Sequence, residues 1–248
     1  MLAAEALRLA AIEVLCPTAA LVAGSGFPTL AAEHVFDSRA AALQDLDQTA
    51  TYTPTLALYT PAARSTRRGA HSDVLDTDAA ATLEIIAELS TQCTEGDDTY
   101  ADALGMADTD AKARLVLAAL CAQVRHTLEW SAGGAMFRRL AVRIIGVSEE
   151  AHAVPQIGLR WSRVFMTYSC EVPDDDFSAG GMPEPLAGLA AALPATSYAK
   201  EKLTELAEAF APSSPVPLEE IRIAAGVGRL PDDIDDGDAT ASVDTSED

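Results

Sequence analysis

Residues 82–90 alternate strictly between two sets of side chains, and this alternation constrains the fold more than any other feature of the chain. The residues on the apolar face are Leu83, Ile85, Ala87 and Leu89. A period of two is typical of a β-strand with one buried face. A second extended run, residues 55–60, lies between Pro54 and Pro61. We therefore expect a sheet that is covered on one side.

Two segments with helical patterns are expected to pack on this sheet. Residues 2–16 have apolar side chains at helical spacing, and Pro17 ends the pattern because its ring cannot continue the hydrogen-bond ladder. The clearest stripe consists of Leu117, Leu120, Cys121, Val124 and Leu128. Thr109 or Asp110 would cap this second helix, and Gly133-Gly134 would end it. These elements predict an α+β fold, an antiparallel or mixed sheet packed with two main helices.

The remaining elements are shorter. We predict a short strand at 34–36, a helical turn at 40–46, and strands at 140–149 and 159–172, the last with a bulge near Ser162-Arg163. After a Gly- and Pro-rich linker, helical patterns occupy residues 186–193 and 197–210. The last 18 residues contain eight acids and no base, too polar a segment to fold alone. The expected organisation is an α+β domain at 1–176, an extension at 177–230 and an acidic tail at 231–248.

The net charge of the chain argues against two classes of partner, nucleic acids and anionic membranes. The chain has 17 Lys and Arg against 38 Asp and Glu, a formal net charge of −21 at pH 7. Binding to nucleic-acid phosphates or to an anionic membrane needs clustered cations, so we expect neither. No apolar run in the sequence is long enough to span a membrane, and the first residues lack the basic segment of a secretory signal. We therefore expect a soluble protein made inside a cell.

No pattern typical of catalysis or metal binding is found. The cysteines are Cys16, Cys93, Cys121 and Cys170, far apart in the sequence, and we interpret them as structural thiols. The four histidines show no metal-ligand spacing. Asp174, Asp175 and Asp176 are adjacent, which favours a solvated loop over a cation site. The sequence lacks a phosphate-binding glycine loop and a nucleophile elbow. We expect no catalytic residue, no cofactor and no metal.

Three arginines stand close together in segment 61–78, which we expect to be a long loop between the first two strands. Two interpretations stay open: the loop is solvated and partly neutralised by its own aspartates, or its guanidinium groups pair with carboxylates of a neighbouring subunit. Three further arginines, Arg138, Arg139 and Arg143, are expected at the start of a strand and suit the same kind of contact. The candidate interface residues are Arg64, Arg67, Arg68, Asp73, Asp76, Arg138 and Arg139.

The order of the predicted elements is helix, strand, long loop, strand, helix, strand, strand. This order resembles the tail terminator, or tail completion, proteins of long-tailed phages and the related tail or neck proteins of gene transfer agents. The matching segments are residues 7–15, 54–59, 82–89, 115–130, 140–149 and 160–172. The resemblance covers residues 1–176 and rests on hydrophobic pattern and element order. Residues 177–248 extend beyond the core of that family.

The resemblance implies a structural virion protein, made in the host cytoplasm, that forms a ring of six subunits at the head-proximal end of the tail tube. Such a ring ends tube polymerisation and joins the tail to the neck. The implied partners are other copies of the chain, a tail tube protein and a neck or head–tail connector protein. DNA would pass through the ring without sequence-specific binding, and an acidic passage repels its phosphates. In that family the loop between the first two strands reaches a neighbour, and residues 61–78 occupy this position.

Other functions remain open. A head-side connector or stopper protein of the neck would share most of these features. A non-viral binding module of a salt-adapted cell would be a monomer or dimer with an apolar pocket, and it would leave the arginine segment without a role. An enzyme is the third class, for which the sequence offers no set of nucleophile, base and orienting group.

Overall fold

The computed structural model describes residues 1–47, 49–69, 76–95, 98–103, 105–106, 111–154 and 159–210. Within these residues, one mixed sheet contains seven strands. They are β1 (Val35–Asp37), β2 (Thr53–Arg67), β3 (Thr77–Glu95), β4 (Asp98–Ala103), β5 (Gly105–Met106), β6 (Arg143–Val154) and β7 (Leu159–Val172). Strands β1, β2, β3, β7 and β6 lie side by side in that order, with β4 beside one end of β3 and β5 beside the start of β7. β1 is parallel to β2, and the other pairs are antiparallel.

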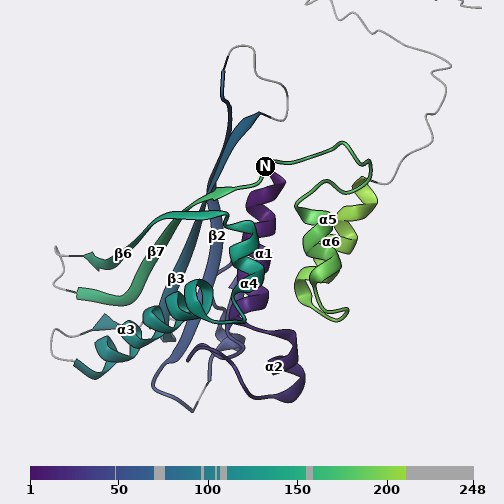
Figure 1. Ribbon diagram of the computed structural model, residues 1–248. Helices are drawn as coiled ribbons and strands as arrows, with labels where there is room; N and C mark the ends of the chain where they lie inside the picture. The colour runs from purple at the N-terminus through teal and green to yellow at the C-terminus, as the bar shows by residue number, and fades with distance from the viewer. Residues whose placement is uncertain are drawn as a thin grey trace, which may run out of the picture. The chain divides into compact units, whose positions relative to one another are not determined.

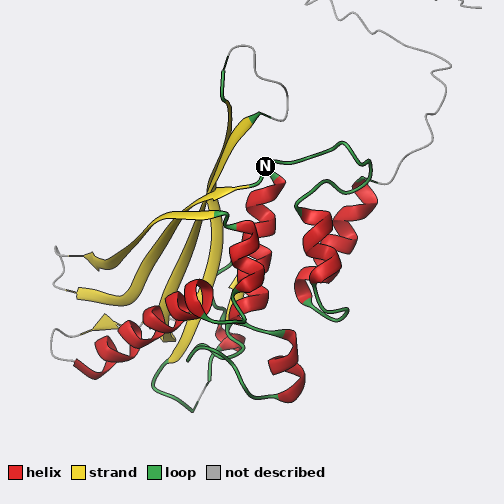
Figure 2. Cartoon of the chain, in the orientation of Figure 1, coloured by secondary structure: helices red, strands yellow, loops and turns green. Residues whose placement is uncertain are grey.

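The helices lie on one face of this sheet (Figure 1, Figure 2). They are α1 (Leu2–Leu15), α2 (Thr18–Ala23), α3 (Ala111–Arg125), α4 (Ala135–Leu140), α5 (Leu186–Ala192) and α6 (Tyr198–Ala209), with a 3₁₀ turn η1 (Leu43–Asp45) and a π-helical turn η2 (His126–Trp130). Helix α1 packs on β2 and β3, and α3 packs on β3 and β7. The predicted α+β class with a mixed sheet is therefore confirmed.

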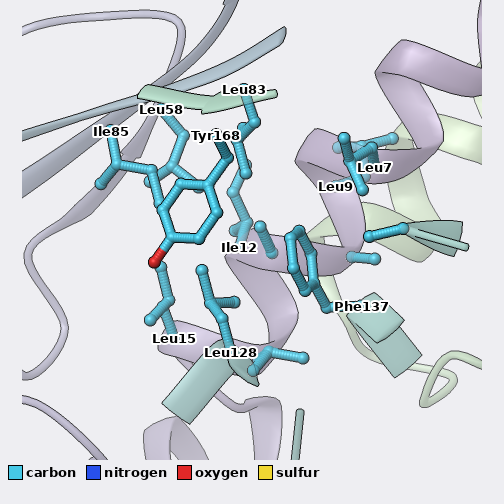
Figure 3. Packing of buried hydrophobic residues seen from close by; sticks show 14 of the residues in the cluster. Leu7, Leu9, Ile12, Leu15, Leu58, Leu83, Ile85, Leu128, Phe137 and Tyr168 are labelled. Carbon is cyan, nitrogen blue, oxygen red and sulfur yellow. The ribbon is translucent and has the colours of Figure 1, made fainter. Parts of the chain in front are cut away.

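The alternating segment forms the middle of β3, as predicted, and its four apolar-face side chains are fully buried. Ile85 pairs with Leu58 of β2 on one side and with Met166 of β7 on the other, so the apolar face continues across three strands. Figure 3 shows Tyr168 of β7 reaching from the sheet toward the helices. The ring of Phe137 from α4 meets it edge-on, with ring centroids 6.2 Å apart. Burial of each such large side chain contributes roughly 1.5–3 kcal/mol.

The second predicted helix is confirmed, since all five residues of its stripe are buried. Its α-helical part ends at Arg125 and η2 continues it to Trp130, before the two glycines. The proposed caps Thr109 and Asp110 lie outside the described residues.

The strand predicted at residues 140–149 begins only at Arg143, because residues 135–140 form α4. Phe137 and Leu140 are both buried, and a spacing of three brings them to one face of a helix but to opposite faces of a strand. The expectation that Arg138 and Arg139 begin a strand is therefore wrong. The bulge predicted near Ser162-Arg163 is confirmed, because the β6–β7 register shifts between the pairs Ala151–Val164 and Ala153–Arg160.

The first predicted helix is confirmed as α1, but α2 was not expected after Pro17. Glu13 makes α2 possible by accepting hydrogen bonds from both the backbone N–H and the hydroxyl of Thr18. Together, α1 and α2 (Leu2–Ala23) are long and apolar enough to cross a membrane by length and composition. This contradicts our expectation that no apolar segment of the sequence reaches that length. In the fold, however, Leu7 and Leu15 are fully buried against the sheet and neighbouring helices, which is the packing of a core helix.

Residues beyond 176 contribute to the same hydrophobic core. The helical patterns at 186–193 and 197–210 are confirmed as α5 and α6, and both helices contact α1. Leu186, Leu189 and Leu203 belong to one buried cluster with the side chains of α1 and the sheet. The acidic tail 231–248 and residues 211–230 lie outside the described residues. The short strand and the helical turn predicted before β2 are confirmed as β1 and η1.

Candidate functional site

The segment that we expected to be a long loop is largely strand. β2 continues through Pro61 to Arg67 and pairs with the start of β3 as far as Thr77. Pro61 is tolerated because the register shifts between Tyr59 and Ala62, so the proline occupies a bulge, where its missing N–H breaks no ladder bond. Residues 62–69 and 76–78, called the arm below, project from the sheet (Figure 1).

The base of the arm is attached to the rest of the fold. The Ser65 hydroxyl donates a hydrogen bond to Asp174, just after β7. The neighbouring Asp175 accepts hydrogen bonds from the backbone N–H groups of Leu2 and Ala3, at 2.8 and 2.7 Å. A carboxylate at a helix N-terminus also interacts favourably with the helix dipole. The arm therefore begins beside the N-terminus of α1, and Asp174 and Asp175 position these two elements.

The three arginines of the arm have different surroundings. Arg68 pairs with Asp78 at 2.9 Å and with Asp76 at 3.6 Å, and the hydrogen bond from Arg68 to Asp78 raises the pKa of the guanidinium. Arg64 and Arg67 are exposed and form no ion pair with any residue that the structure describes. The charge of Arg68 is thus neutralised within the arm, while Arg64 and Arg67 remain exposed to solvent. Asp73 lies outside the described residues.

Arg138 and Arg139 belong to α4, in the helical layer, and no contact in the described part of the chain joins them to the arm. Arg138 donates a hydrogen bond to the carbonyl oxygen of Leu128, at 3.0 Å, and so stabilises the end of η2. Arg139 is exposed and borders a small cavity of about 200 Å³ between α4 and α5. The structure therefore does not bring the two predicted arginine groups together.

A larger cavity, of about 540 Å³, lies where the end of α1, β1, η1 and the start of α6 meet. We call it the acidic cavity, because it is lined by four carboxylates. They are Glu13, Glu33, Asp37 and Asp45. Sequence reasoning missed it, since its lining comes from segments that span residues 12 to 198 and share no motif.

Ion pairs organise the wall of the acidic cavity. Arg39 pairs with Asp45 at 2.6 Å, and its guanidinium carbon lies 4.2 Å from the centroid of the Phe36 ring. The hydrogen bond from Arg39 lowers the pKa of Asp45. Asp37 pairs with Arg8 at 2.7 Å and accepts a hydrogen bond from the Tyr198 hydroxyl at 3.0 Å.

Two weak acids line the same cavity in their neutral forms. Burial and the nearby Asp37 raise the pKa of Tyr198 to about 12. Burial and the charge of Glu13 raise the pKa of Cys16 to about 11, so this thiol is not activated as a nucleophile. Carboxylates beside aromatic faces are suited to binding organic cations, above all a guanidinium group. Among the described residues, no group of three or more His, Cys, Asp and Glu is arranged to hold a metal ion.

Comparison with known proteins finds no match, whether among described families, curated proteins or solved structures.

Proposed function

We propose that this protein is a tail-terminator-type structural subunit, which forms a ring at the head-proximal end of a phage tail tube. The ring ends polymerisation of the tube, joins the tail to the neck and lets DNA pass. The observation that carries this proposal is the arm, a two-stranded projection with exposed arginines on a chain of net charge −21. The order of α1, β2, arm, β3, α3, β6 and β7 also agrees with the order in the family that the sequence resembles.

The arm lacks a buried face within one subunit. Every residue from Pro61 to Arg67 is exposed, so this part of β2 buries no apolar surface that would stabilise it within one subunit. At residues 62–65 only the edge of β2 is free, because the paired residues 79–82 of β3 also pair with β7. Beyond them, at 66–67 and 77–78, neither strand has a further partner strand among the described residues. Free strand edges favour pairing with another chain. The unpaired guanidinium groups of the arm also complement the acidic surface of another copy. An arm that binds the next subunit supplies the heterologous contact from which rings are built.

Charge supports the proposed passage for DNA. Six acidic subunits around a narrow bore create a negative potential that extends over a Debye length of about 10 Å in 0.1 M salt. Phosphates are repelled from such a wall, so the duplex slides without adhering. The arm arginines do not oppose this repulsion if they are buried between subunits.

The oligomeric state of the purified protein tests the proposal. We expect light scattering to give the mass of six chains, and negative-stain images to show rings with an opening that admits duplex DNA. When added to a growing tail tube of the same phage, the protein should shorten the tubes and cap one end. A monomer at all concentrations, with no effect on tube length, would refute the proposal.

Two alternatives have distinct outcomes in the same experiments. A head-side connector or stopper would form rings but leave tube length unchanged. A binding module would form no ring. The volume of the acidic cavity lies in the range of ligand pockets, about 300–1,000 Å³, but its four carboxylates differ from the apolar lining expected for this class. The arm would then have no role.

A further inference from the structure

We propose that the acidic cavity of one subunit receives Arg67 from the arm of the next copy. Arg64 lies three residues earlier in the same strand, so its side chain points to the opposite face of the arm. This inference rests on the proposed ring and names the surface that closes it. It assigns a partner to one of the two cations left unpaired among the described residues of the arm. It also gives a ligand to a cavity of about 540 Å³.

Charge complementarity is the first argument. Four carboxylates line the cavity against one lining guanidinium, that of Arg39. Arg8 offsets one more charge from outside the lining, through its contact with Asp37. The cavity thus keeps an excess of two negative charges, so it can accept the guanidinium of Arg67. Glu33 is exposed at the cavity and has no ion pair among the described residues, so it can accept a guanidinium without losing a partner.

The chemistry of the cavity wall is the second argument. The wall already holds one guanidinium in the arrangement that the proposal requires, because Arg39 lies over the Phe36 ring and pairs with a carboxylate. Tyr198, which is 43% exposed, presents a second aromatic ring at the cavity. Arginine is the cation best suited to such a site, since its planar group stacks on rings and forks onto carboxylates.

The third argument is that the contact must form between two chains. The base of the arm lies beside the N-terminus of α1, through Ser65, Asp174 and Asp175. The cavity is lined by Ile12, Glu13 and Cys16, at the other end of the same helix. A helix of this length spans roughly 20 Å, and the arm projects away from it (Figure 1). Different patches at opposite ends generate a head-to-tail contact, which closes a ring if the rotation allows.

A mixing experiment tests the proposal. The arm variant R67A removes the guanidinium without adding a charge that could attract the lysines of the cavity variant, and it keeps a normal cavity. The cavity variant E33K/Q44K keeps a normal arm, and it changes two exposed residues with no hydrogen bond or ion pair among the described residues. We expect each variant alone to lose the ring, with its association weakened at least about tenfold. An equimolar mixture can form one intact junction per pair, so we expect a 1:1 heterodimer and no larger species by sedimentation velocity.

The control variant S148K/E149K introduces the same change of charge on exposed residues of the edge strand β6. We expect it to assemble like the wild type, and melting curves should show that all variants fold. If E33K/Q44K forms normal rings, or the mixture gives no heterodimer, the cavity is not the acceptor. If S148K/E149K alone abolishes assembly, the acceptor is the β6 edge. If one of these results is obtained while the wild type forms rings, the cavity is not the acceptor, but the proposed function stands. A monomeric wild type would refute the proposed function as well.

Discussion

At Gly134, the surrounding backbone, rather than the conformation of the glycine, excludes a larger side chain. Its φ of −71° is open to any residue. A Cβ at this position, however, would lie 2.3 Å from the carbonyl oxygen of Thr127 and 2.6 Å from that of Leu128. We had interpreted Gly133-Gly134 as a helix stop, but the helical turn ends at Trp130. Gly134 instead allows the start of α4 to approach η2.

Gly134→Ala should therefore lower the free energy of unfolding by roughly 1–3 kcal/mol, because backbone atoms must move to admit one methyl group. Gly133→Ala is the matched control, since its Cβ would meet only the Ser131 hydroxyl, at 3.6 Å. Urea unfolding of the two variants measures the difference. Equal stabilities would contradict the proposed role of the close approach.

The cysteines provide a second prediction at the scale of single residues. Burial raises the pKa of Cys16 and Cys170 to about 11 and that of Cys121 to about 12. Cys93 is only half-buried. At pH 8 in the folded protein, iodoacetamide should thus modify Cys93 first, because a raised pKa and burial both deplete accessible thiolate. Mass spectrometry gives the order of modification, and all four should react in denaturant. Early modification of Cys16 would contradict the packing of the acidic cavity.

At the scale of elements, the residue that caps the N-terminus of α6 is itself buried. The Ser197 hydroxyl accepts a hydrogen bond from the backbone N–H of Lys200, at 3.2 Å, and Ser197 is only 1% exposed. An N-cap serine satisfies one of the free N–H groups in the first helical turn. The start of α6 is thereby fixed, and with it the position of Tyr198 at the acidic cavity.

Ser197→Ala should lower the free energy of unfolding by about 1 kcal/mol. Thr204→Ala is the control on the same helix, because the Thr204 hydroxyl only donates to the Lys200 carbonyl oxygen on an exposed surface. We expect the control to be neutral or slightly stabilising, since alanine has the higher helix propensity. Chemical unfolding of both variants measures the two free energies. An unchanged free energy of unfolding for Ser197→Ala would show that the cap contributes nothing to stability.

Elements with an apolar face could be predicted from the sequence, and those without one could not. The alternation around Ile85 and the stripe through Leu120 predicted β3 and α3, because burial selects apolar residues at the period of each element. The arm was predicted as a loop because exposed strand residues show no such period and Pro61 suggested a stop. The acidic cavity depends on long-range packing, which brings Glu13, Asp37 and Tyr198 together from separate elements.

At the scale of the whole molecule, a net charge of −21 opposes any association of copies. Assembly then depends on local attraction that exceeds the general repulsion between subunits. Within the described residues, Arg64 and Arg67 on the arm are the cations best placed to supply it. Salt screens both effects, but pairs that become buried at an interface are screened less than exposed charges.

The triple variant R64E/R67E/R68E should weaken oligomerisation, and more strongly at about 0.05 M than at about 0.5 M salt, because screening reduces the new repulsion. Sedimentation velocity at the two salt concentrations measures this dependence. The control K112E/R114E/A118E/A122E makes the same change of net charge on exposed residues of α3 and should cause a smaller loss. A triple arm variant that assembles like the wild type at both concentrations would exclude a role for these arginines.

One strand joins two regions that are subject to different selection. Leu56 and Leu58 of β2 are fully buried, and nearly every substitution there disrupts packing. A few residues further along the same strand, from Ala62 to Arg67, no side chain is buried. We expect mutations in this part to leave the fold intact, so its amino acids would be free to diverge together with the proposed surface that the arm contacts. Among homologues, substitutions at 62–67 should therefore co-vary with that surface and not with the core.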